Sequence, residues 1–220
     1  MVSKLAKMAA FVSVMGITHA APSIAAEKLF NSSSNLTAKY AREMGATLPP
    51  KGWVEFCRGA PENCRGGVGS RIRVKLDKQR WRELDDVNAY VNNAIEPATD
   101  LEVHNLEEHW AIPEERGDCE DYVLLKRQHL MSLGWPREAL LITVVLDEEK
   151  EGHAVLTVIT DKGEFVLDNQ NRQVLSWTGT NYQFIKRQAQ VNPALWVALD
   201  PLASRRLRKT SSENRMGEGR

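Results

Sequence analysis

The sequence has no excess of charge of either sign and, beyond its start, no long apolar run. Its 220 residues include 29 lysines and arginines and 29 aspartates and glutamates, so the net charge is zero. General nucleic-acid binders carry a basic excess, and we therefore expect no nucleic-acid partner. After residue 26 no stretch reaches 18 apolar residues, which argues against a membrane-spanning helix there. With 9 prolines, 14 glycines and no repeat at solenoid spacing, fibrous and repeat architectures are excluded.

The first 26 residues have the pattern of a secretory signal peptide. Lys4 and Lys7 give a positive start, residues 8–17 form an apolar run of ten, and small residues follow at 20–26. The run is too short to cross a bilayer, although an uncleaved segment would act as a membrane anchor instead. Cleavage removes two lysines and leaves 27 basic and 29 acidic residues, about −2. We expect a secreted, periplasmic protein in an oxidising compartment.

The remaining chain has the size and composition of one folded domain. Hydrophobic residues make up 42% of the sequence, enough for a packed core. We predict a flexible polar entry segment over 27–45, one domain over 46–200, and a basic disordered tail over 204–220. The tail has six basic residues and two acids, so a weak contact with an anionic surface is the alternative.

Three cysteines in an exported chain indicate one disulfide and one free thiol. Cys57 and Cys64 are seven positions apart in a stretch rich in turn residues, which favours a small disulfide loop. Half of a metal site is the alternative, but no Cys or His pair lies nearby at ligand spacing. Cys119 is then unpaired, and a lone cysteine is usually a buried structural residue.

Helical periodicity precedes a series of strand-like runs, which predicts an α+β fold. Apolar positions in residues 77–95 recur at helical spacing, and a second helix begins at Asp118, with Asp121 as the partner in a capping box. Residues 100–116 read as a long connector, and we expect the end of a strand within residues 68–76. The expected strands, mostly antiparallel, are residues 140–146, 154–160, 164–168, 181–187 and 194–199.

Cys119 lies in the first turn of its predicted helix, where unpaired N–H groups and the helix dipole favour a thiolate. His153, which opens a strand, and Asp168, which closes the next, are candidates for the base and its orienting acid. With Lys162-Gly163 as the hairpin loop, Asp168 pairs with Thr157, four residues and about 13 Å from His153 but on the same face. The competing histidines at 104, 109 and 129 are more simply explained as structural.

Acidic residues crowd this cysteine, which should raise the pKa of its thiol. Five of them fall within eight residues: Glu114, Glu115, Asp118, Glu120 and Asp121. Favourable interaction with the helix dipole explains one or two of them. The rest suggest a bound cation, and carboxylate oxygens select a hard ion such as Ca²⁺.

Three sequence blocks resemble the bacterial transglutaminase-like cysteine peptidases. They are Gly117-Asp118-Cys119-Glu120-Asp121-Tyr122, Gly152-His153-Ala154-Val155-Leu156 and Val166-Leu167-Asp168-Asn169, supported by Val87-Asn88, Trp110 and Pro113-Glu114. The resemblance covers roughly residues 50–190, and Glu108 stands where the family often has Asp. It implies a papain-like, transglutaminase-type core, with helices and the nucleophile at a helix N-terminus packed on an antiparallel sheet. Its nucleophile would be Cys119, its base His153 and its acid Asp168, with calcium held by Asp118, Glu120 and Asp121.

These observations together predict an exported, calcium-dependent cysteine endopeptidase. Its substrate would be a periplasmic or cell-surface protein, such as a biofilm adhesin, and the resemblance adds an inner-membrane regulatory receptor as a partner. Two alternatives stay open: a protein-glutamine acyl transferase, which uses the same triad, and a catalytically silent calcium-binding module of the same fold.

Overall fold

The computed structural model describes residues 39–64 and 69–201. The predicted signal peptide 1–26, the entry segment up to residue 38, Val68 and the tail 204–220 lie outside the described residues. Among the described helices, each is too short or too polar to cross a membrane.

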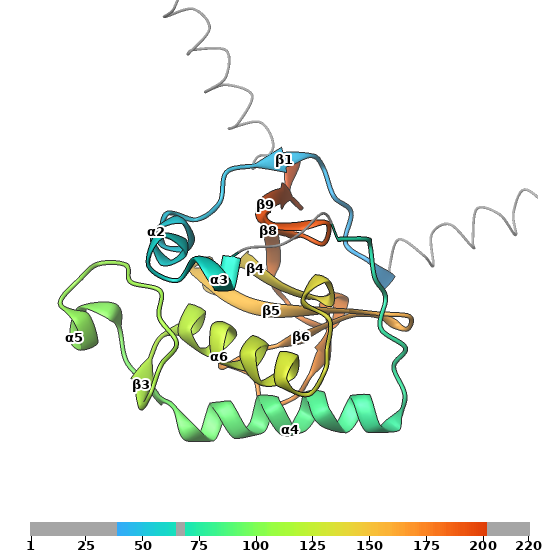
Figure 1. The fold of residues 1–220 in the computed structure, drawn as a ribbon, viewed down its shortest axis with the longest axis horizontal. Coiled ribbons are helices and arrows are strands. Elements are labelled where there is room, and N and C mark those ends of the chain that lie inside the picture. Colours follow the sequence, from blue (N-terminus) through green and yellow to red (C-terminus); the bar gives the residue numbers. More distant parts are fainter. Residues whose placement is uncertain (1–38, 65–68, 202–220) are drawn as a thin grey trace, which may run out of the picture. The chain divides into compact units, whose positions relative to one another are not determined.

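The described residues form a seven-stranded antiparallel sheet in the order β1-β9-β8-β4-β5-β6-β7 (Figure 1). Its central strands β4 and β5 are buried along nearly their whole length, which explains their continuous apolar and β-branched sequences. All five predicted strands are present, with ends shifted by a few residues. The strands are β1 (Ala46–Thr47), β4 (Leu140–Leu146), β5 (Gly152–Thr160), β6 (Gly163–Leu167), β7 (Leu175–Ser176), β8 (Gln183–Ala189) and β9 (Asn192–Ala198).

Two helices cover one face of the sheet. Helix α6 (Cys119–Ser132) packs against β5 and β4, and α4 (Lys78–Ala94) packs against α6 (Figure 1). Helix α4 begins as predicted, because Asp77 accepts the Arg80 N–H at 2.9 Å. Since α6 lies between α4 and the sheet, it is buried on nearly all sides. The observed α+β arrangement agrees with the predicted fold class.

The opposite face of the sheet is covered by the chain before β1. Ala41 packs there in a cluster with the buried side chains of Val155 and Phe184, and the Tyr40 hydroxyl donates to the Thr160 carbonyl at 2.9 Å. The strand expected within residues 68–76 is reduced to a single bridge between Val74 and Thr160. Both faces are therefore covered, which buries the middle of β5 completely.

Cys57 and Cys64 form the predicted disulfide. The surrounding loop was predicted wrongly, because the two cysteines lie in short helices, α2 (Lys51–Gly59) and α3 (Pro61–Cys64). The turn residues mark only the break between these helices. Pro61 begins α3, a position at which proline's missing N–H costs nothing.

The connector 100–116 contains more structure than predicted. It begins with helix α5 (Asp100–His104), whose N-terminus has a complete capping box formed by Thr99 and Glu102. It ends in β3 (Arg116–Gly117), which pairs in parallel with β2 (Glu96–Pro97). The chain that leaves β2 therefore comes back to pair with it through β3. Cys119 follows β3 after a single residue. Two 3-10 turns, η1 (Arg137–Ala139) and η2 (Trp177–Gly179), complete the elements.

Candidate active site

Cys119 is the first residue of α6, as predicted. Asp118 occupies the N-cap position with an extended backbone, φ −106° and ψ −165°. The predicted capping interaction of Asp118 is not formed, because its carboxyl makes no cap hydrogen bond. Asp121, its expected partner, accepts the Ala111 N–H at 2.8 Å instead. The first N–H groups of the helix thus remain without a side-chain cap, beside the cysteine.

The sulfur of Cys119 lies between a backbone donor and a carboxyl group. The N–H of Ala154, the residue after His153, donates to Sγ at 3.4 Å, and Glu120 Oε2 lies 3.1 Å from Sγ. Burial and the adjacent Glu120 raise the pKa of the Cys119 thiol well above its usual value, against the effect of the Ala154 N–H. Without a cation, the site therefore favours the thiol.

His153 and Asp168 are in direct contact. His153 Nε2 lies 2.8 Å from Asp168 Oδ1, and both side chains are only 3% exposed. Burial would raise the pKa of Asp168, but the hydrogen bonds from His153, Tyr182 and the Gln170 N–H, with the His153 charge, hold it below its usual value. With Nε2 engaged, Nδ1 is the ring nitrogen left for proton exchange with another group.

The strand register explains how this contact forms. The predicted hairpin loop was displaced by one residue: Thr160 pairs with Gly163, and Leu156 with Leu167. Gly163 pairs with Thr160 and so begins β6 rather than completing the loop, and its φ of +137° is a conformation that glycine adopts without strain. The shift brings Asp168, just after β6, two residues closer to His153 than predicted. The shared face was predicted correctly, and the remaining offset is spanned by the side chains.

Three polar side chains hold Asp168, and of these the sequence analysis named only Asn88, as part of the Val87-Asn88 match and without a role. The Tyr182 hydroxyl donates to Asp168 Oδ2 at 2.6 Å, and its ring lies edge-on to His153 at 5.8 Å. Asn88 Oδ1 accepts the Asp168 N–H at 3.1 Å, and Asn92 Nδ2 donates to the Asp168 carbonyl at 2.8 Å. Asn88 is fully buried on the apolar face of α4, so a polar residue at a core position was the signal available in the sequence.

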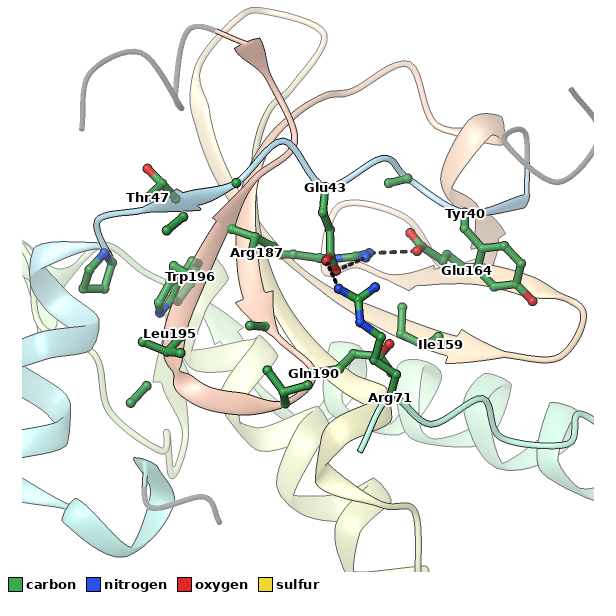
Figure 2. A pocket seen from close by; sticks show the side chains of 18 of the residues that line it. Tyr40, Glu43, Thr47, Arg71, Ile159, Glu164, Arg187, Gln190, Leu195 and Trp196 are labelled. Atoms are coloured by element: carbon green, nitrogen blue, oxygen red, sulfur yellow. Dashed lines mark hydrogen bonds and ion pairs between the residues drawn. The ribbon is translucent and has the colours of Figure 1, made fainter. Parts of the chain in front are cut away.

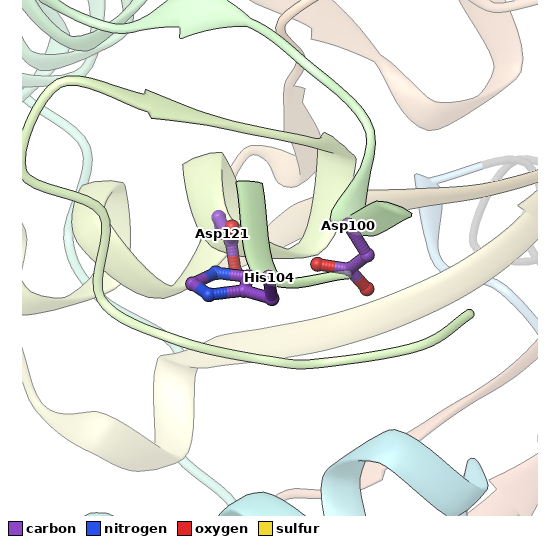
Figure 3. Close-up of side chains that lie close together, drawn as sticks. All are labelled: Asp100, His104 and Asp121. Carbon is purple, nitrogen blue, oxygen red and sulfur yellow. The ribbon is translucent and has the colours of Figure 1, made fainter. Parts of the chain in front are cut away.

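The acidic residues near Cys119 form two overlapping groups that share Asp100. Asp118 and Glu120 join Asp100 in one, while Asp121 joins Asp100 and His104 in the other, with ligand atoms within 4.8 Å of one another. Figure 3 shows the Asp100 carboxylate and the His104 ring, both from α5, beside Asp121 from α6. Asp100 was missed because it lies 19 positions before Cys119 in the predicted connector. Glu114 and Glu115, by contrast, are exposed.

The group formed by Asp100, Asp118 and Glu120 has the properties of a cation site. Asp118 Oδ1 is buried and makes no hydrogen bond with the described residues. Burial and the charge of Asp118 raise the pKa of Glu120 to about 9, and burial raises the pKa of Asp121 to about 7. Buried carboxylates without a counter-charge are unfavourable, and an all-oxygen donor set suits a hard divalent ion. These residues therefore fit Ca²⁺.

The competing histidines have structural contacts. The rings of His104 and His109 lie 4.4 Å apart, and the His129 ring lies edge-on to Tyr90 at 5.2 Å. Among the described residues, it is His153 that contacts Asp168.

A cavity of about 1030 Å³ lies away from these residues, between the chain before β1 and the β8–β9 hairpin (Figure 2). It contains a ladder of alternating charges: Arg71 contacts Glu43 at 2.7 Å, and the buried Arg187 contacts Glu43 at 3.1 Å and Glu164 at 2.8 Å. Because these charges pair with one another, the ladder ties the segment before β1 to the sheet. A smaller cavity of about 140 Å³ is lined in part by Asp168 and Tyr182.

The chain was compared with known proteins. The model of a family described as bacterial transglutaminase-like cysteine proteinase BTLCP matches residues 43–204. The calcium-bound structure of LapG from Legionella pneumophila is 23% identical over 57% of this chain and 72% of that one, with a TM-score of 0.48. The EGTA-treated structure of LapG from the same organism is 23% identical over 53% and 66%, with a TM-score of 0.45. The comparison with curated proteins gave no match.

Proposed function

The chain belongs to the bacterial transglutaminase-like cysteine proteinases, and from this premise we propose that it is an exported endopeptidase that uses Cys119, His153 and Asp168. The observation that carries the proposal is the hydrogen bond between His153 and Asp168 beside the sulfur of Cys119, which accepts the N–H of the residue after His153. These groups come from three separate segments of the chain. A nucleophile, a base and a group that orients the base are what acyl transfer requires.

In the proposed reaction His153 takes the proton of the Cys119 thiol. The sulfur attacks a peptide carbonyl carbon, and the tetrahedral intermediate loses the amine, which receives the proton from His153. Water then hydrolyses the thioester, with His153 again as the base, and the thiol is restored. Asp168 holds the imidazole with Nε2 toward it and stabilises the imidazolium. The backbone N–H of Cys119 is a candidate oxyanion donor at the start of α6.

We propose Ca²⁺ as the cation of this site, held by Asp100, Asp118 and Glu120, with Asp121 adjacent. When bound, the ion would supply positive charge that offsets these carboxylates and so favours the thiolate. The support comes from the chain itself, since Glu120 lies 3.1 Å from the sulfur and is one of the causes that raise the pKa of the thiol. Asp121 is bonded to the backbone of Ala111 and would brace the loop before the nucleophile.

We propose the periplasm as the compartment and a periplasmic or surface protein, such as a biofilm adhesin, as the substrate. The signal pattern of residues 1–26 supports export, and the disulfide between Cys57 and Cys64 is typical of an oxidising compartment. A regulatory receptor in the inner membrane is part of the same proposal, and it rests on the family resemblance of the sequence.

The Cys119→Ala variant tests the endopeptidase. It should fold as the wild type does, because one sulfur contributes little to packing, and it should lose all cleavage. Proteomics of exported proteins from cells with the wild type and the variant would reveal the substrate as new N-termini that are present only with the wild type. Unchanged proteolysis in the variant would overturn the assignment.

Two other functions are separated by direct measurement. A protein-glutamine acyl transferase would yield cross-linked or aminated glutamine instead of a new N-terminus. The raised pKa of Cys119 in the absence of a cation favours a silent binding module, for which iodoacetamide labelling at pH 7 in Ca²⁺ would show only ordinary, slow thiol reactivity.

A further inference from the structure

The cavity of about 1030 Å³ beside the chain before β1 has no part in the proposed reaction. Cys119, His153 and Asp168 are not among the residues that line it. Its walls are the segments 40–49 and 71–73 and the β8–β9 hairpin, over the sheet face that the chain before β1 covers (Figure 2). Cavities of about 300 to 1,000 Å³ with a few convergent polar groups are the usual binding sites for small ligands. This cavity is therefore large enough for a short peptide.

Two buried charged side chains that line the cavity keep an unused hydrogen-bonding atom each. Arg187 Nη1 lies 2.8 Å from Glu164 Oε1, and the two side chains are 4% and 2% exposed. Arg187 Nε and Glu164 Oε2 are also buried, yet they make no hydrogen bond with the described residues. Buried polar atoms without a partner are unfavourable. A ligand with both a carbonyl oxygen and an N–H group would satisfy this donor and this acceptor together.

The cavity also carries an excess of positive charge, because three arginines and two glutamates line it. Arg71 and Arg187 both contact Glu43, at 2.7 and 3.1 Å. The third guanidinium, that of Arg73, lies 4.0 Å from the ring centroid of Tyr40 and forms no ion pair with the described residues. Guanidinium groups bind carboxylates through paired N–H donors, so the excess charge favours a ligand with a carboxylate.

A contact from the β8–β9 hairpin fixes the backbone between two of these arginines. Gln190 Nε2 donates to the Ile72 carbonyl at 2.6 Å. Arg71 and Arg73 flank Ile72, and both line the cavity. Groups that are held in place before binding lose less freedom when the ligand arrives, which favours recognition.

We propose that this cavity binds the C-terminal end of a short peptide. The free carboxylate pairs with Arg73 and Arg71. A backbone carbonyl accepts from Arg187 Nε, and a backbone N–H donates to Glu164 Oε2. An inorganic anion fits less well, because it leaves the buried acceptor unpaired, whereas a peptide can also place an apolar side chain against Leu195 of the hairpin. The site is separate from the proposed endopeptidase, whose success or failure does not affect it.

The test is isothermal titration calorimetry of the full chain with the tripeptide glycyl-glycyl-leucine. From the usual binding energy per ligand atom, one molecule should bind per chain with a Kd of about 0.2 mM. The same peptide with an amidated C-terminus should bind about tenfold more weakly, and so should the free peptide to Arg73→Gln, because each loses a charged hydrogen bond. Arg82→Gln, which removes an exposed arginine from α4, is the matched control and should bind as the wild type does.

Three results would overturn the inference: no binding at about 10 mM peptide, equal affinity for the peptide and its amide, or equal affinity of Arg73→Gln and the wild type. Displacement of the peptide by inorganic phosphate at the same concentration would indicate a plain anion site and would also overturn it. Arg73 is exposed, so the variant should fold. If it does not, Arg71→Gln replaces it, and failure of both variants to fold would show that these arginines serve only the fold.

Discussion

The Asp168→Asn variant separates the charge of this residue from its geometry. Asp168 Oδ1 accepts from His153 and from the Gln170 N–H at 3.0 Å, whereas Oδ2 accepts from the Tyr182 hydroxyl at 2.6 Å. The backbone N–H of Gln170 can only donate, so the amide oxygen of the asparagine must take the Oδ1 place. The new NH₂ group then faces Tyr182, whose hydroxyl can turn round and accept. The imidazole should keep its orientation and lose only the negative charge beside it.

The expected loss of Cys119 reactivity follows from the strength of the hydrogen bond between His153 and residue 168. A hydrogen bond between charged groups contributes about 1.5 to 3 kcal/mol, and a neutral one roughly half of that. Since the neutral bond to the asparagine keeps about half of this, the imidazolium loses about 0.75 to 1.5 kcal/mol, and the pair of Cys119 thiolate and His153 imidazolium becomes roughly 4- to 13-fold rarer at neutral pH. The assay is the rate of Cys119 alkylation by iodoacetamide at pH 7 in Ca²⁺, followed by kcat/KM once a peptide substrate is known. Asp168→Ala also loses the orientation and should react more slowly still.

The Tm of the wild type and of Asp168→Asn, measured by thermal unfolding over a range of pH, is the control for this experiment. Because the pKa of Asp168 is lowered from 3.8, its ionised form stabilises the folded state above that pH, and this stabilisation is lost as the pH falls through the lowered value. The difference in Tm between the wild type and Asp168→Asn should therefore shrink in acid. An alkylation rate for Asp168→Asn within twofold of the wild type, in a folded protein, would refute the role of the charge.

Three further predictions concern the supports of the site. Tyr182→Phe should cost about 1 to 2 kcal/mol of stability and slow alkylation severalfold, because Asp168 loses a donor; unchanged alkylation would show that the hydroxyl does not support the carboxylate. In EGTA, Tm should fall as the pH rises from 4.5 toward 9, because Glu120, whose pKa burial and a neighbouring carboxylate raise to about 9, ionises unfavourably in the folded state. Saturating Ca²⁺ should raise Tm, most at high pH, and a Tm indifferent to Ca²⁺ would contradict the cation site. Replacing Cys57 and Cys64 by alanine should lower the free energy of unfolding by about 2 to 3 kcal/mol in a denaturant titration, and an unchanged value would argue against the loop-entropy estimate.

Local patterns in the sequence predicted most of the elements. Helix α4 agrees with its apolar spacing, and the runs of β-branched residues became β4, β5 and β6. Such patterns are readable because burial on one face of an element repeats with the period of that element. The prediction failed at the short helices α2, α3 and α5, which have too few turns for an apolar repeat to stand out from the surrounding turn residues. There, turn residues such as Gly59 and Pro61 looked like one loop rather than the break between two helices.

The sequence offered Cys119, His153 and Asp168 as candidates through their types and spacing, and the structure brings His153 and Asp168 into contact. Their surroundings were not recognisable. Asn88 and Asn92 reach Asp168 across 80 and 76 positions of the chain, and Asp100 joins the acidic group from another helix. These contacts arise only when α4 packs against α6 and when α5 folds back beside the start of α6. Such packing depends on the shape and burial of the whole core, which no local periodicity records.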